Sequence, residues 1–128
     1  AAVLGGIVGF ERERLNRAAG LRTHIMVSLG AALFVLVPLE LGANSSDLAQ
    51  MVKGIAAGIG FLGAGAILKL ISEREIKGLT TAATIWVTAA VGLASAAGQA
   101  WLAAVTVVIS LLALVALAGV EPDPNGKM

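Results

Sequence analysis

Residues 51–71 read MVKGIAAGIGFLGAGAILKLI, an apolar run that carries five glycines and no acidic residue. A helix needs about 20 predominantly apolar residues to cross a bilayer. Polar and apolar side chains do not alternate here as they would in a half-buried strand. The run therefore predicts a membrane-spanning helix.

The rest of the sequence repeats this pattern of apolar runs and short polar breaks. The other runs cover 1–10, 25–41, 79–97 and 100–120, and the breaks cover 11–24, 42–50, 72–78 and 98–99. We therefore expect an all-α fold: a polytopic transmembrane bundle of about five helices over 1–120, with a polar cytoplasmic tail at 121–128. The first run is too short to span, so we expect a truncated first helix. A signal peptide is disfavoured because no basic segment precedes the run.

Composition supports a membrane protein and disfavours several classes of function. The chain is 58% hydrophobic and 13% charged, whereas soluble domains carry about 25% charged residues. A net charge of +1 gives no field that would recruit nucleic acid. The sequence has no cysteine and a single histidine, His24, which excludes thiolate chemistry and a histidine-cluster metal site. No nucleophile–base pair is visible, so we expect a protein that is not an enzyme.

The distribution of basic residues predicts the orientation in the membrane. Arginine and lysine concentrate on the cytoplasmic side of membrane proteins. The break 11–24 holds four arginines and the break 72–78 is also basic, whereas the breaks 42–50 and 98–99 have no basic residue. These counts alternate, which predicts an N-terminus outside and a C-terminus in the cytoplasm.

The glycines of 51–71 form two small faces if the helix is regular. Gly54, Gly58 and Gly65 share one face, and Gly60 and Gly63 lie roughly opposite. Small residues let helix backbones approach closely in lipid, so two such faces predict a central helix with neighbours on both sides. Two alternatives stay open: local unwinding around 58–65 beside a polar cavity, and a homodimer face on Gly54 and Gly58.

The break 11–24 carries the first group of polar residues that need partners. Glu11 and Arg14 are three residues apart on a continued helix and can pair. A solvated, self-neutralised helix end is the plain interpretation, but the interleaved carboxylates favour specific partners such as Arg22 or the basic turn 74–77.

Thr23 is a suitable N-cap for the second span, which puts His24 in its first turn. A structural role for this histidine is favoured over a ligand role. Proton sensing stays open because imidazole titrates near neutral pH.

A second helix entry, GLTTAATIW, ends at Trp86. Thr80 or Thr81 is expected to cap this helix, with Thr84 and Thr88 on the same side. Such a threonine stripe bonds backbone carbonyls or a neighbouring helix, or it lines a small polar groove. Trp86 lies deeper than an interfacial aromatic belt, so we expect it to pack between helices.

Four motifs occur in order along the chain: GFERER at 9–14, GLRTHIMVSLGAA at 20–32, GIGFLGAGAI at 58–67 and REIKGLTTAATIWVTAAVGLA at 74–94. Together they resemble the membrane domain of the MgtC/SapB family over about 1–120. The matching positions are Glu11, Arg12, Glu13, Gly20, Arg22, Thr23, His24, Asp47, Gly58, Gly60, Phe61, Gly63, Gly65, Gly78, Thr80, Thr81, Ala82 and Trp86. Many members carry a basic residue three positions after the outer Asp, where this chain has Gln50.

The resemblance implies a bacterial inner-membrane protein linked to growth in low magnesium, acid tolerance, virulence and intracellular stress. It implies binding to membrane proteins such as the F-type ATP synthase, with a homodimer as a further expectation. No cofactor is expected, and magnesium is the one ion that the resemblance suggests. No carboxylate lies in the middle of a span, whereas coupled cation carriers usually keep one there.

Our leading hypothesis is a partner-binding or regulatory module with a polar site at the cytoplasmic face. The candidate residues are Glu11, Arg12, Glu13, Arg22, Thr23, His24, Asp47, Thr80 and Thr81. The alternative is a small-ion transporter or channel that carries Mg²⁺ or protons.

Overall fold

The computed structural model describes residues 1–68 and 78–118, and in these residues it contains helices and short connections only. The helices are α1 (Ala2–Arg14), α2 (Leu21–Glu40), α3 (Ser45–Leu68), α4 (Leu79–Ala96) and α5 (Ala100–Ala116). The all-α prediction of about five helices is confirmed. The tail at 121–128 and most of the break 72–78 lie outside the described residues.

The helices have the lengths and composition of a membrane protein. Three of them, α2, α3 and α4, are long and apolar enough to cross a bilayer. Helix α5 is apolar and somewhat shorter, and α1 has 13 residues.

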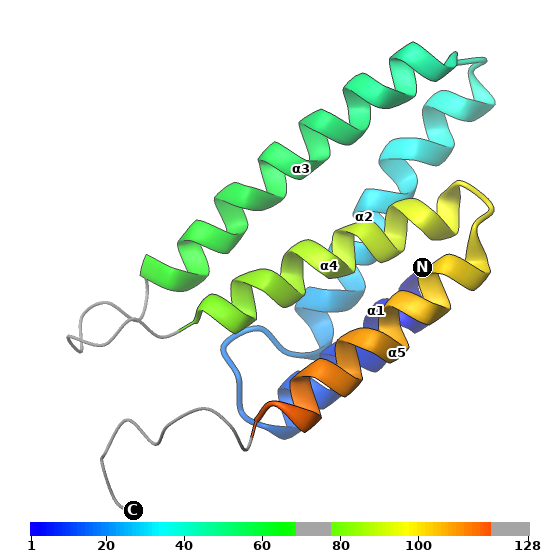
Figure 1. The fold of residues 1–128 in the computed structure, drawn as a ribbon. Coiled ribbons are helices and arrows are strands. Elements are labelled where there is room, and N and C mark those ends of the chain that lie inside the picture. The colour runs from blue at the N-terminus through cyan, green and yellow to red at the C-terminus, as the bar shows by residue number, and fades with distance from the viewer. Residues whose placement is uncertain (69–77, 119–128) are drawn as a thin grey trace, which may run out of the picture.

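Successive helices run in opposite directions (Figure 1). As a result, the end of α1, the start of α2 and the start of α4 lie at one end of the bundle, together with the ends of α3 and α5. We call this end the polar end, because Glu11–Arg14 and Gly20–His24 lie there. The side of the membrane that it faces is a prediction from the basic residues.

Helix α4 is the centre of the bundle, because it contacts each of the other four helices. One of its faces carries Ile85 and Ala89, which pack with Val27 and Ala31 of α2. Another carries Val91, which packs with α1 and α5. Burial on two faces explains why α4 has little exposed surface.

Three glycines set the spacing of α1, α2 and α4, and we call them the tight glycines: Gly5, Gly9 and Gly92. A Cβ on Gly5 would lie 2.6 Å from the Cβ of Ser28, and one on Gly9 would lie 2.8 Å from the Cα of Leu21. A Cβ on Gly92 would collide with the backbone carbonyl of Ser28. Only a residue without a side chain permits such approach, which is the usual way that helices associate in lipid.

The prediction that α3 is a central helix is wrong. It packs on α4 and, less extensively, on α2 through one face that includes Ile55, Ile59 and Gly63. At four of its glycines, a Cβ would meet no atom within 4 Å in the described chain apart from the adjacent backbone of α3 itself; these open glycines are Gly54, Gly58, Gly60 and Gly65. The alternative of local unwinding around 58–65 is excluded, because α3 is helical without a break.

Trp86 corrects a second packing prediction. Its side chain is 53% exposed on α4, so it does not pack between helices. The buried positions of this helix are instead small or β-branched residues, among them Thr84, Thr88 and Gly92. Helices that approach this closely leave no room for an indole ring, which therefore lies on the outside.

Candidate polar pocket

A pocket of about 370 Å³ opens at the polar end between α1, α4 and α5. Its polar lining comes from Arg12, Arg17, Thr80, Thr84 and Ser110. The remaining walls are apolar and are made by Val8, Leu15, Ala83, Val87, Ala113, Leu114, Leu117 and Ala118. The pocket thus combines two cationic side chains with apolar walls, and none of the described residues that line it is acidic.

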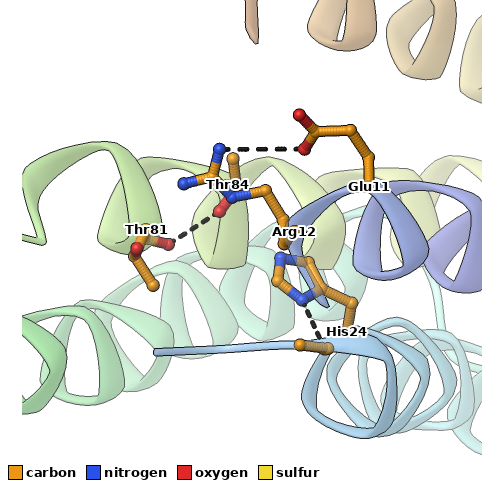
Figure 2. A network of polar contacts seen from close by, with 6 residues as sticks. Glu11, Arg12, His24, Thr81 and Thr84 are labelled. Carbon is orange, nitrogen blue, oxygen red and sulfur yellow. Dashed lines mark hydrogen bonds and ion pairs between the residues drawn. The ribbon is translucent and has the colours of Figure 1, made fainter. Parts of the chain in front are cut away.

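Arg12 is the central residue of this pocket. It is only 2% exposed, although it lies two residues from the end of α1. Its Nη1 lies 3.7 Å from Oε2 of Glu11, and Figure 2 shows the guanidinium beside Thr84 of α4, which lines the same pocket. The ion pair is therefore Glu11–Arg12 and not the expected Glu11–Arg14.

The Glu11 carboxylate remains short of hydrogen bonds. Both of its oxygens are buried, and neither has a hydrogen-bond partner within the described part of the chain. A buried carboxylate is costly without a cation beside it, so Arg12 and Glu11 stabilise each other. This pair is built into the wall of the bundle and is not a solvated helix end.

His24 lies under Arg12 in the first turns of α2 (Figure 2) and is fully buried. Its Nδ1 lies 2.9 Å from the carbonyl oxygen of Gly20, so this nitrogen carries the proton and donates. Nε2 is buried with no hydrogen-bond partner among residues 1–68 and 78–118. The burial results from Gly9, whose missing side chain brings α1 against the Cβ of His24.

Threonines of α4 form the opposite side of this polar group. Thr84 donates to the Thr81 carbonyl at 2.8 Å, and Thr88 donates to the Thr84 carbonyl at 2.7 Å. All three threonines are buried. The hydroxyl protons of Thr84 and Thr88 are thus used within the helix, and the hydroxyl oxygen of Thr84 stays available at the pocket wall.

The expected caps at the polar end are wrong. Helix α2 begins after Gly20, and no side chain of its own caps it. Instead, Glu13 of α1 accepts a hydrogen bond from the Leu21 N–H at 2.8 Å. Thr23 is exposed inside the helix. Helix α4 begins after Gly78, which has a left-handed φ of 93° that favours glycine, so neither Thr80 nor Thr81 is its cap.

The structure brings together some of the predicted site residues and separates others. Glu11, Arg12, His24 and Thr81 lie in one group (Figure 2), and Thr80 lines the same pocket as Arg12. Arg22 is exposed, and no ion pair joins it to Glu11 in the described ranges. The suggested contact with 74–77 lies outside the described residues.

Asp47 belongs to the opposite end of the bundle. Its carboxylate accepts from the Asn44 N–H at 3.0 Å, and the Asn44 side chain accepts from the N–H groups of Ser46 and Asp47. This reciprocal pattern is a capping box at the start of α3. Asp47 therefore has a structural role far from the pocket.

Two lining residues, Arg17 and Ser110, were not predicted. Arg17 was visible as one of the basic residues of the break 11–24, but nothing in its spacing distinguished it from Arg14. Ser110 lies in the most apolar run, where a lone serine ordinarily bonds its own helix, as it does here to the Thr106 carbonyl.

The donor set of the pocket does not fit a resident magnesium ion. Magnesium prefers carboxylate oxygens and retained water, whereas the charged lining residues are arginines. Over the described ranges, no three His, Asp or Glu side chains group closely enough to hold a metal. The arrangement suits an anionic or hydrogen-bond-accepting ligand instead.

Comparison with known proteins gives the family. The family model for "MgtC family" matches residues 1–122. Protein SrpB of Synechococcus elongatus is 42% identical over 89% of this chain and 69% of its own length. YhiD of Escherichia coli, described as a candidate magnesium transporter, is 40% identical over 89% of this chain and 55% of its own.

Protein MgtC of Brucella abortus is 46% identical over 84% of this chain, but the match covers only 44% of that protein. The chain thus spans about half the length of two of these three relatives. No solved structure matches it. The family match extends over nearly the whole bundle, including the residues of the polar pocket, and on this evidence the chain belongs to the MgtC family.

Proposed function

We propose that this chain is a non-enzymatic membrane module that regulates adaptation to low magnesium, acid or intracellular stress by binding a partner at the polar pocket. The proposal places the pocket at the cytoplasmic face of the bacterial inner membrane. It takes the lipid bilayer and other membrane proteins as partners, with the F-type ATP synthase as the candidate that the family suggests.

One observation carries the proposal: Arg12 is almost fully buried yet lines an open pocket. A cation is costly to bury at a helix end that could be solvated. Thr80 and Thr84 lie beside it in the lining, and Glu11 holds it from the side. A purely structural helix end would need none of this arrangement, whereas a binding site would.

Two neighbouring arginines offer a matched test. Arg12 lines the pocket, and Arg14 is exposed and does not line it. In a low-magnesium growth assay that depends on the protein, we expect Arg12→Gln to lose complementation and Arg14→Gln to keep it. Membrane levels of both variants are measured in parallel, so that a loss through misfolding is distinguished from a loss of function. Equal growth of the two variants at equal levels would reject the proposal.

Ion transport is the competing function, and the description of YhiD favours it. It requires a polar path along α4, but the hydroxyl protons of Thr84 and Thr88 are bonded within the helix. Flux of Mg²⁺ or protons into liposomes that contain the chain is the direct assay, with Glu11→Gln as the control. We expect no flux above that of empty liposomes, and a flux lost in the Glu11→Gln variant would favour transport.

A further inference from the structure

The polar pocket has the lining of a site for an amphiphilic anion. Its lining combines Arg12, Arg17 and the Thr80 hydroxyl with apolar side chains such as Val87 and Leu114. This mixture of cationic and apolar groups lies between helices of a membrane protein. A soluble ion would use only the cationic and polar part of such a lining.

The cationic residues of the lining, Arg12 and Arg17, can bind phosphate oxygens. A guanidinium binds phosphate through two parallel hydrogen bonds, more strongly than neutral donors do. Helix α4 also begins beside Thr80 with no side-chain cap, so its positive end adds to the field of the two arginines. Glu11 offsets part of the Arg12 charge from the side, but Arg17 keeps the lining cationic.

The apolar part of the lining suits an acyl chain. Its residues Val87, Ala113 and Leu114 come from α4 and α5, and Ala113 is itself exposed on the outside of α5. In a bilayer an exposed lining position of this kind faces lipid, so an acyl chain can reach the pocket from the lipid phase. Basic pockets between membrane helices are known to hold anionic lipid headgroups.

We propose that the polar pocket binds a phosphate-bearing amphiphile, an anionic phospholipid whose phosphate contacts Arg12 and Arg17 and whose chain lies against α4 and α5. The inference rests on the proposed role of this pocket as a binding site. It goes further by naming the chemical class of the ligand.

The test measures the melting temperature of the full chain in neutral detergent as phosphatidylglycerol, phosphatidylcholine or inorganic phosphate is added. Phosphatidylglycerol should stabilise the protein saturably, and phosphatidylcholine should do so much less. In the Arg17→Gln variant the apparent affinity for phosphatidylglycerol should fall about three- to tenfold, the loss expected for one charge-assisted hydrogen bond at a partly exposed site. Arg14→Gln, which alters an exposed arginine outside the pocket, should bind as the parent does.

Arg17→Gln is the primary variant because Arg17 is exposed and its loss should leave the fold intact, whereas Arg12→Gln is a secondary one. Saturable stabilisation by inorganic phosphate without stabilisation by phosphatidylglycerol would overturn the lipid proposal and assign the site to a soluble phosphate. Equal stabilisation by the two lipids, or equal losses in Arg17→Gln and Arg14→Gln, would overturn the proposal. If lipid binding fails while the growth defect of Arg12→Gln remains, the pocket serves a different partner and the proposed function stands.

Discussion

Two glycine pairs with the same spacing have opposite surroundings in this protein. Gly5 and Gly9 of α1 pack against α2, whereas a Cβ on Gly54 or Gly58 of α3 would have no neighbour from another helix within 4 Å in the described part of the chain. Both pairs match the glycine-xxx-glycine pattern of associating membrane helices. The pattern therefore shows that close approach is permitted, and the rest of the chain decides whether it occurs.

The largest effect on the free energy of unfolding should come from adding a side chain to the closely packed pair, Gly5 and Gly9. Gly9→Ala puts a Cβ within 2.8 Å of the Cα of Leu21, so α1 must move away from α2. We expect the free energy of unfolding in mixed micelles to fall by about 3 kcal/mol, the upper range for overpacking against backbone. A loss below about 0.5 kcal/mol, the ordinary level for surface substitutions, would mean that the two helices are not so closely packed.

The hydrogen bond between Ser28 and the Ala1 carbonyl, at the same contact of α1 and α2, should contribute less to the free energy of unfolding. Ser28 is fully buried and donates to the Ala1 carbonyl at 3.0 Å, which joins α2 to α1. Ser28→Ala removes this bond between the helices, while the Ala1 carbonyl keeps the Gly5 N–H at 2.9 Å, so the substitution should cost about 1 kcal/mol. The exposed Ser46→Ala serves as the control and should cost little in the same unfolding titration.

A smaller loss of stability is expected when the hydrogen bond from the Leu21 N–H to Glu13, at the other end of α1, is weakened. The Glu13 carboxylate accepts from the first N–H of α2 at 2.8 Å and lies at the positive end of that helix. Glu13→Gln keeps an acceptor but removes the charge, so we expect a loss of about 0.5–1 kcal/mol that shrinks in high salt. A loss that does not depend on salt would assign the contribution to the hydrogen bond alone.

The smallest effect on the free energy of unfolding should come from substitutions at the open glycines Gly54 and Gly58. Gly54→Ala and Gly58→Ala add a methyl where no other described helix comes within 4 Å, and alanine favours helix over glycine. We expect changes within about 0.5 kcal/mol, or a slight gain. The same variants, followed by cross-linking in membranes, test the predicted homodimer: if they reduce a cross-linked dimer, a second copy covers this face.

The sequence predicted the helices well, because the lengths of the apolar runs and the polar breaks are local properties. It also predicted that the region of Glu11 and His24 meets the start of α4, and the structure places Arg12 and Thr80 in one pocket. That inference needed only alternating spans, which bring every second break to the same end of the bundle.

The packing partners could not be predicted in this way. The five glycines in 51–71 predicted close packing of α3, whereas the closely packed pair Gly5 and Gly9 lies in the run 1–10, which looked too short to span a membrane. The burial of His24 depends on Gly9, fifteen positions away, and the position of Trp86 depends on how closely α4 is surrounded. The predicted helix caps were wrong for the same reason, because the residue that accepts a hydrogen bond from the start of α2 is Glu13, which belongs to α1.

The attachment of α3 by a single face has a consequence for the order of synthesis. Ribosomes produce α3 before α4, which is the helix that it contacts most extensively. During that interval α3 must remain in the bilayer without its main neighbour, and its other contact, with α2, is limited. The face of α3 that carries the open glycines is apolar, and it contacts lipid tails as favourably as it would contact another apolar helix. The helix can therefore stay in the bilayer by itself and pack on α4 once α4 has been made.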